Sequence, residues 1–180
     1  MKQIQQIEYD ETREMIREFS KAFGRPVNNV PTTPSVTDRL LLGKLLLEET
    51  LEYIEKGLGL DLTYEGDILD GSLMTLGHSE GQRYDPVEAA DGLGDVNVII
   101  HFNALWEGID LTAVTNEIHR SNMSKLGPAG EPIVNGVGIA CEGGSYYDPS
   151  KPAGKILKGP NYSPPNLLPI LGIIPDEEEE

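Results

Sequence analysis

The sequence predicts an all-α protein of about four main helices, followed by an irregular arm. Three observations favour this fold class. Apolar residues recur at helical spacing through the first 125 residues, Asp, Ser and Thr caps precede the strongest helical segments, and glycine and proline become dense from residue 127. A chain of 180 residues most simply forms one domain, expected here over residues 1–175, and can bury a core.

The first two helices follow from apolar periodicity and from their ends. A first helix is expected over residues 9–24, where a glycine ends it. A proline-rich connection follows. A second helix is expected over about 36–56, with Ser35 or Thr37 as its N-cap and Gly57 just past its end.

Residues 58–84 are glycine-rich without a sustained period, and we interpret them as an insertion that can form a hairpin. The third helix has the clearest start, because Asp85 can cap it, Pro86 suits its first position and Glu88 can close a capping box. This helix is expected to run to Gly108.

A fourth helix is expected from its cap Asp110 to about Asn122. The Gly- and Pro-rich segment 127–175 is expected to be an irregular arm that wraps the helical core. The last five residues, 176–180 ("DEEEE"), are expected to form a disordered acidic tail.

Charge and cysteine content restrict the classes of partner. The formal net charge is −16, and a chain this acidic lacks the basic surface that binds nucleic acid, whereas it can collect divalent cations. The one cysteine, Cys141, suits a reducing compartment. The sequence shows no membrane-spanning run and no signal-peptide pattern. A cytoplasmic protein without membrane partners is therefore expected.

The second helix carries an unusual run of glutamates: Glu48, Glu49, Glu52 and Glu55 fall within eight residues of a leucine-rich stretch. Like charges at helical neighbour spacing repel by a few tenths of a kcal/mol per pair. Either this face of the helix is solvated, or cations offset the repulsion.

A second acidic stripe lies on the third helix, where Glu88, Asp91 and Asp95 occur at i, i+3 and i+7. Most of the rest of that helix is apolar and is expected to be largely buried. A divalent metal shared by the two helices would keep the carboxylates ionised, and oxygen ligands favour Mg²⁺ or Mn²⁺. Asp91 and Asp95 alone could instead be partners of the helix dipole.

These residues resemble a known family. "EETLE" (48–52) followed by "EAADGLGD" (88–95) is similar to the E-E-x-x-E … E-x-x-D signature of the MazG-like, all-α nucleoside triphosphate pyrophosphohydrolases. "HRSNMSKL" (119–126) and "GKILKGPNY" (154–162) resemble later segments of short phage and bacterial members. The gap of 35 residues between Glu52 and Glu88 is longer than is usual in the family.

The resemblance implies hydrolysis of (d)NTPs to the monophosphate and pyrophosphate, with two or three Mg²⁺ or Mn²⁺ ions, in homodimers or homotetramers. It implies metal ligands at Glu48, Glu49, Glu52, Glu88 and Asp91, and Asp95 is a further ligand candidate on the same face. A carboxylate not fully engaged with metal can act as the general base, and Glu49 is our choice.

Positive and aromatic side chains near the end of the chain are candidates for substrate binding. A triphosphate needs neutralisation beyond the metals, which favours Arg120, Lys125, Lys155 and Lys158, with Asn122 beside them. Tyr162 can stack on a base or simply pack. His119 is more typical of a surface position than of a ligand.

Three functions remain open from the sequence. The short phage branch includes MazZ-type enzymes that act on (d)GTP, so guanine is the expected base and the host cytoplasm the expected location if the source is a phage. A pyrimidine substrate such as dUTP or dCTP is the alternative within the same chemistry. A non-catalytic helical adaptor with an acidic docking face is the alternative from another class.

Overall fold

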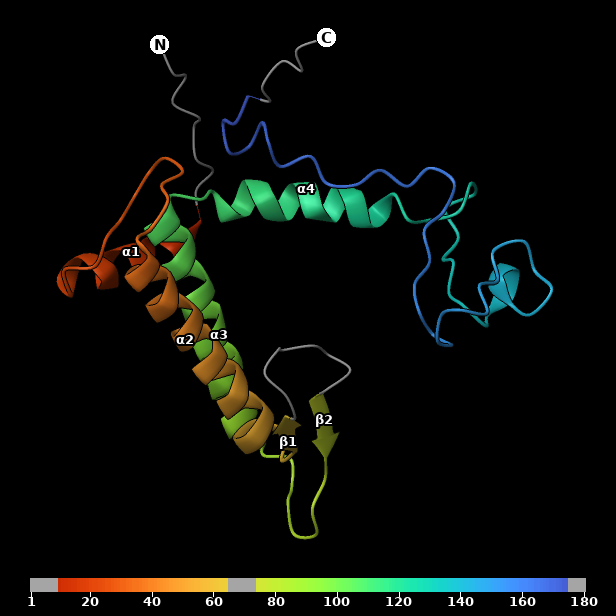
Figure 1. Ribbon diagram of the computed structural model, residues 1–180, viewed down its shortest axis with the longest axis horizontal. Helices are drawn as coiled ribbons and strands as arrows, with labels where there is room; N and C mark the ends of the chain where they lie inside the picture. The colour runs from red at the N-terminus through yellow and green to blue at the C-terminus, as the bar shows by residue number, and fades with distance from the viewer. Residues whose placement is uncertain (1–9, 65–73, 175–180) are drawn as a thin grey trace. The chain divides into compact units, whose positions relative to one another are not determined.

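The structure is a computed structural model that describes residues 10–64 and 74–174 (Figure 1). The chain divides after Ile109 into two compact units, which are described separately as the helical unit and the C-terminal unit. The described residues are mainly helical and their only sheet is a two-stranded hairpin, so the all-α prediction is confirmed in its coarse form. Within these residues, no helix is sufficiently long and apolar to cross a membrane.

The helical unit begins with α1 (Glu11–Ala22), close to its predicted bounds. Its N-cap is Asp10, whose carboxylate accepts a hydrogen bond from the Arg13 backbone N–H at 3.1 Å. The connection after α1 returns to the end of the third helix, where the Asn28 N–H donates to the Leu105 carbonyl at 2.8 Å. This bond fixes the proline-rich connection against the core.

The second helix, α2 (Val36–Glu52), continues into one π-helical turn, η1 (Tyr53–Gly57). Its cap is Ser35, whose hydroxyl oxygen accepts from the Asp38 N–H at 3.1 Å. In η1 the Leu58 N–H donates five residues back, to the Tyr53 carbonyl. The predicted extent of 36–56 is confirmed, but the widened last turn was not expected. Such turns often occur at functional sites.

The insertion forms the predicted hairpin. β1 (Asp61–Tyr64) pairs antiparallel with β2 (Met74–Gly77), with Asp61 opposite Gly77, and the residues that join the strands lie outside the described ranges. Ser79 and Gln82 donate side-chain hydrogen bonds to the Asp61 carboxylate, and these bonds hold its pKa below the ordinary value. The return segment is thus tied to the base of the hairpin.

The third helix, α3 (Pro86–Glu107), lies alongside α2 (Figure 1). As predicted, Asp85 caps it by accepting from the N–H groups of Val87 and Glu88. The reciprocal bond of a capping box is not formed, because the Asp85 N–H donates instead to the Gly57 carbonyl at 3.0 Å. Asp85 therefore joins the end of η1 to the start of α3.

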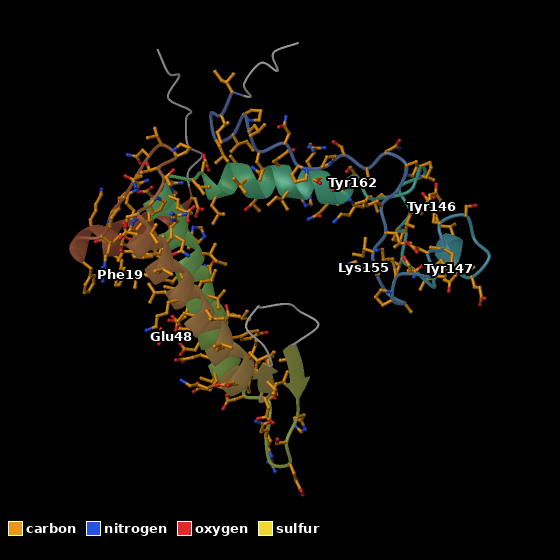
Figure 2. The ribbon with its side chains drawn as sticks, in the orientation of Figure 1. Phe19, Glu48, Tyr146, Tyr147, Lys155 and Tyr162 are labelled. Carbon is orange, nitrogen blue, oxygen red and sulfur yellow. The ribbon has the colours of Figure 1, made fainter. Side chains whose placement is uncertain are left out.

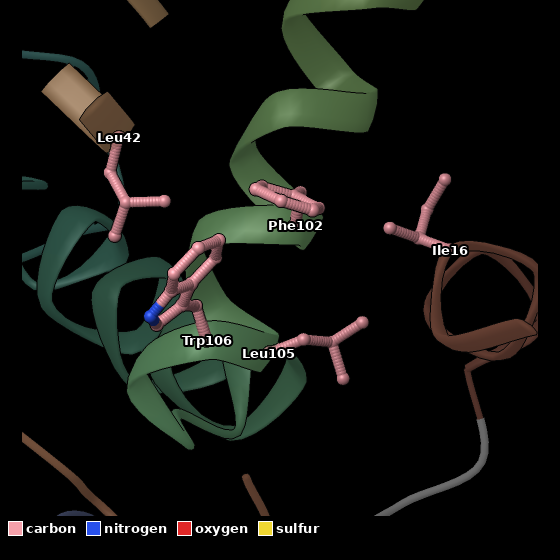
Figure 3. Packing of buried hydrophobic residues seen from close by; sticks show 5 residues of the cluster. All are labelled: Ile16, Leu42, Phe102, Leu105 and Trp106. Atoms are coloured by element: carbon pink, nitrogen blue, oxygen red, sulfur yellow. The ribbon is translucent and has the colours of Figure 1, made fainter. Parts of the chain in front are cut away.

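The core of the helical unit is a cluster contributed by α1, α2 and α3 (Figure 3): Ile16, Leu42, Phe102, Leu105 and Trp106. The rings of Phe102 and Trp106 meet edge to face, with centroids 5.4 Å apart. Trp106 is therefore a core residue, as predicted. The expectation that the apolar residues of α3 are largely buried holds only in part, because Ile100 is 39% exposed.

The C-terminal unit contains α4 (Leu111–Met123), which begins where Asp110 accepts from the Ala113 N–H, as predicted. The arm that follows consists of turns, one short 3₁₀ helix, η2 (Gly138–Ala140), and an isolated bridge between Val134 and Ile156. Its irregular character is confirmed over the described residues.

A buried asparagine organises this arm. Asn135 is 2% exposed, and its amide nitrogen donates to the carbonyls of Asp148 and Lys151 at 2.9 and 2.8 Å. Its side-chain oxygen accepts from the Asp148 N–H at 3.0 Å. Satisfying a buried amide in this way allows a segment without regular secondary structure to hold one conformation.

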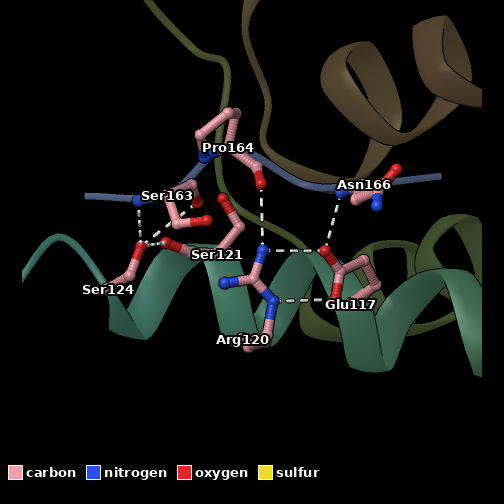
Figure 4. A network of polar contacts seen from close by, with 7 residues as sticks. All are labelled: Glu117, Arg120, Ser121, Ser124, Ser163, Pro164 and Asn166. Atoms are coloured by element: carbon pink, nitrogen blue, oxygen red, sulfur yellow. Dashed lines mark hydrogen bonds and ion pairs between the residues drawn. The ribbon is translucent and has the colours of Figure 1, made fainter. Parts of the chain in front are cut away.

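A polar clamp ties residues 163–166 to α4 (Figure 4). Glu117 pairs with Arg120 and accepts from the Asn166 N–H at 2.7 Å, and Arg120 also donates to the Pro164 carbonyl at 2.9 Å. One turn later, the Ser124 hydroxyl oxygen accepts from the Ser163 N–H at 2.9 Å. We call these contacts the α4 clamp.

Acidification is expected to open the α4 clamp. The Arg120 guanidinium and the Asn166 N–H lower the pKa of Glu117 from 4.5 to about 2. Because the folded-state pKa is lowered, the stabilising contribution of Glu117 is present above pH 4.5 and is lost as the pH falls towards 2. An NMR titration of the Glu117 carboxyl carbon and the Asn166 amide should therefore give a shared midpoint near 2, whereas a midpoint near 4.5 would contradict the clamp.

Candidate functional site

The end of α2 with η1 packs closely against the first half of α3. A Cβ atom added to Gly92 would lie 2.9 Å from the Cα of Tyr53, and one added to Gly57 would lie 2.6 Å from the Cα of Ala89. Neither position has room for a side chain without a shift of backbone. The two glycines therefore set the separation of the helices where their acidic stripes meet.

Side chains of both helices line one pocket beside these contacts. The lining consists of Glu49, Glu52, Lys56, Glu88, Asp91, Gly92 and Asp95. Five of the seven residues are carboxylates and one is a cation, which gives the lining a formal charge of −4 (1 − 5). Five of the six predicted metal ligands thus surround a shared space.

The carboxyl of Glu49 has a perturbed pKa. Glu49 is half-buried, and burial raises the pKa of its carboxyl above the ordinary value. The negative charges of Asp95, Glu52 and Glu48 raise this pKa further, in that order. The pocket therefore disfavours the charged form of Glu49 in the absence of added cations.

Lys56 supplies the positive charge in the lining. Its Nζ lies 2.6 Å from Glu52 Oε2, and the hydrogen bond and charge of Glu52 raise the lysine pKa. The charges of Glu88 and Glu49 act in the same direction. The ammonium group thus interacts electrostatically with carboxylates from both helices.

Glu48 occupies a different position from the other predicted ligands. It lies on α2 (Figure 2) and does not belong to the pocket lining, although it is exposed like Glu52, Glu88, Asp91 and Asp95. Its charge still contributes to the raised pKa of Glu49. Glu48 therefore lies beside the acidic pocket and is not one of its lining residues.

The lining suits a divalent ion in donor chemistry and charge. Over residues 10–64 and 74–174, no three His, Cys, Asp or Glu side chains stand close enough together, as placed, to hold a metal ion. The donors available are carboxylate oxygens, which Mg²⁺ and Mn²⁺ prefer. A cationic group already stands against Glu52. The residues therefore fit such an ion, although their side chains would have to converge to bind it.

The predicted phosphate-binding residues all lie in the C-terminal unit, where several are engaged with one another. Arg120 belongs to the α4 clamp. Lys125 donates to the Asn122 side-chain oxygen at 2.7 Å. The clamp gives Arg120 a structural role that sequence reasoning did not foresee.

Lys155 and Tyr162 lie along the arm (Figure 2), and Lys158 lies between them in the sequence. The Lys158 ammonium lies 4.2 Å from the centre of the Tyr162 ring, in a cation–π contact. The Gly159 N–H donates to the Lys125 carbonyl at 3.0 Å, so this part of the arm runs beside the end of α4. Lys155 is exposed, and its carbonyl accepts from the buried Asn135. Tyr162 thus has a partner for its ring within the protein.

Sequence reasoning missed Lys56 and Gly92. Lys56 follows Glu52 by four residues, the spacing of a helical ion pair, and this signal was available. Gly92 interrupts a helix that has no need of a glycine for its own geometry, which is a signal of close packing. Comparisons of the chain with models of protein families and with curated proteins found no match.

Proposed function

We propose that the chain is a metal-dependent nucleoside triphosphate pyrophosphohydrolase of the MazG-like type. The observation that carries this proposal is the acidic pocket, to which α2 and α3 contribute five carboxylates. Like charges at helical neighbour spacing repel one another, and bound cations would offset this repulsion. Other helical proteins use carboxylates on facing helices to hold metal ions.

In this proposal two or three Mg²⁺ or Mn²⁺ ions are held by the five carboxylates of the lining, Glu49, Glu52, Glu88, Asp91 and Asp95. Glu48, beside the lining, is a sixth candidate ligand. When bound, these ions supply positive charge against the triphosphate and the departing pyrophosphate. The chain's own residues provide the metal-binding oxygens, the proton acceptor and the remaining cations.

Glu49 is the proposed general base. In the metal-free protein, burial and neighbouring acids raise its pKa, and a carboxylate with a raised pKa is a stronger proton acceptor. A water molecule attacks the α-phosphorus while its proton passes to a Glu49 carboxylate oxygen. The bond between the α-phosphorus and the α–β bridging oxygen breaks, and pyrophosphate leaves with that oxygen.

Phosphate and base recognition are assigned to the C-terminal unit. Lys125, Lys155 and Lys158, with Asn122, are the proposed phosphate contacts, and Arg120 would have to leave the α4 clamp to join them. Tyr162 offers a ring for base stacking if Lys158 moves from it. Guanine is proposed as the base on the resemblance to MazZ-type enzymes, with a pyrimidine as the alternative.

The proposal is tested with the four ribonucleoside and four deoxyribonucleoside triphosphates in Mn²⁺, with chromatographic identification of the products. Monophosphate and pyrophosphate should appear together, no orthophosphate should form, and EDTA should stop the reaction. Direct release of orthophosphate with a diphosphate product would contradict the assignment. Absence of turnover together with absence of Mn²⁺ binding in calorimetry would favour the adaptor.

We also propose that the chain forms at least a homodimer. Large apolar side chains remain exposed along α2 and α3: Val36, Leu40, Leu47, Val87, Leu93 and Ile100. A second copy that covered such a surface would bury area worth about 25 cal/mol per Å². Light scattering at micromolar concentration should give twice the monomer mass or more, and a monomeric mass would count against this proposal.

A further inference from the structure

Lys56 lies directly against the carboxylate of Glu52. Its ammonium lies 2.6 Å from Glu52 Oε2, and among the residues that the structure describes it is the only cationic group in the lining of the acidic pocket. The Arg17–Glu14 pair of α1 has comparable spacing along its helix but stands outside that pocket. The Lys56–Glu52 pair thus differs from an ordinary surface pair in its surroundings, where four further carboxylates line the same space.

We infer that Lys56 is the counter-ion of the metal-free pocket and that divalent ions displace it from Glu52. This inference rests on the proposed metal-dependent function and deepens it. An ammonium has three hydrogen-bond donors and no acceptor. It can donate to Glu52 only while no metal ion is bound to the same carboxylate oxygens. Its side chain is 58% exposed and sits on a flexible stem, so it can turn into solvent.

Two measurable consequences follow from this exchange of cations. Metal binding must break the Lys56–Glu52 contact, so Lys56 lowers the affinity of the pocket for divalent ions. In the metal-free protein the same ammonium offsets repulsion between the acidic stripes of α2 and α3, so Lys56 raises stability there. One side chain therefore acts in opposite directions on stability and on metal affinity.

The test is Mn²⁺ calorimetry on the full chain, comparing wild type with Lys56→Met. The variant should bind Mn²⁺ about two- to fivefold more tightly, the range expected when an exposed ion pair no longer competes. Lys44→Met is the matched control, because Lys44 is an exposed lysine of α2 outside the pocket lining. Its affinity should stay within about twofold of wild type, and Lys56→Arg should restore the weaker binding.

Thermal melting of the metal-free proteins supplies the second readout. Lys56→Met should melt at a lower temperature than wild type and Lys44→Met, and saturating Mn²⁺ should remove most of this difference. Equal affinity and equal melting in the two methionine variants would overturn the counter-ion role while leaving the metal site intact. If wild type itself binds no Mn²⁺, the proposed function fails, and the role of Lys56 towards metal fails with it.

Discussion

Glu49→Gln is expected to stabilise the metal-free protein while removing most of its turnover. Burial and the charges of Asp95, Glu52 and Glu48 raise the pKa of Glu49, so its ionised form is unfavourable in the folded state. A neutral glutamine of the same shape removes this unfavourable charge. The free energy of unfolding should rise by up to about 1 kcal/mol, as expected for several weakened like-charge contacts. Loss of a general base should lower kcat by about 100-fold or more.

The stabilisation by Glu49→Gln should depend on pH in a defined direction. A carboxyl whose folded-state pKa is raised contributes stability below its unfolded pKa of about 4.5, and this contribution is lost as pH rises through the folded value. The difference in free energy of unfolding between variant and wild type should therefore be present at pH 7 and vanish below about pH 4.5. Urea unfolding at several pH values measures it.

Glu55→Gln is the matched control for Glu49→Gln, because Glu55 is an exposed glutamate of η1 outside the pocket lining. It should leave stability, turnover and the Mn²⁺-induced rise in melting temperature nearly unchanged. For Glu49→Gln, the Mn²⁺-induced rise should be smaller than in wild type, since a ligand is lost. A destabilised variant with an unchanged metal response would show that Glu49 is structural.

Gly92→Ala should destabilise the helical unit. The added Cβ would lie 2.9 Å from the Cα and 3.0 Å from the Cβ of Tyr53, so the backbones of α3 and η1 must separate. Overpacking of this kind costs about 1–3 kcal/mol. Because the same separation moves the two acidic stripes apart, Mn²⁺ affinity should fall together with stability.

Gly94→Ala distinguishes steric overpacking from any general effect of alanine in α3. Nothing lies within 4 Å of a Cβ built at Gly94, which is an exposed position of the same helix. There, alanine should stabilise by about 0.5–1 kcal/mol, the usual gain over glycine inside a helix. Similar denaturation midpoints for the two variants would mean that α3 and η1 do not pack as closely as described.

The parts of the fold that could be predicted are those fixed by local chemistry. The start of α3 follows from Asp85 and Pro86, which act within one turn of the helix. The same holds for the caps at Ser35 and Asp110. The meeting of Glu49 and Glu52 with the stripe on α3 could be proposed because helical periodicity puts each set on one face.

Features that depend on contacts between distant segments could not be predicted in this way. The local sequence of Tyr53–Gly57 does not predict the π-helical turn η1, since this turn forms where the segment packs on α3. The pairing of Arg120 with Pro164 joins residues 44 positions apart, and nothing local distinguishes that arginine from a phosphate ligand. Residues 176–180, predicted to be a disordered tail, lie outside the described ranges.

The hydrogen bond between Gly57 and Asp85 has a consequence for how this architecture tolerates change. The Asp85 nitrogen and the Gly57 oxygen are 3.0 Å apart, so the two ends of the segment between them meet at one point of the helical pair. The entropy of closing such a loop grows only slowly with its length. The hairpin is therefore a module that evolution can lengthen, shorten or replace without moving α2 against α3. A change in the number of residues between Glu52 and Glu88 should therefore leave the mutual geometry of the two acidic stripes unchanged.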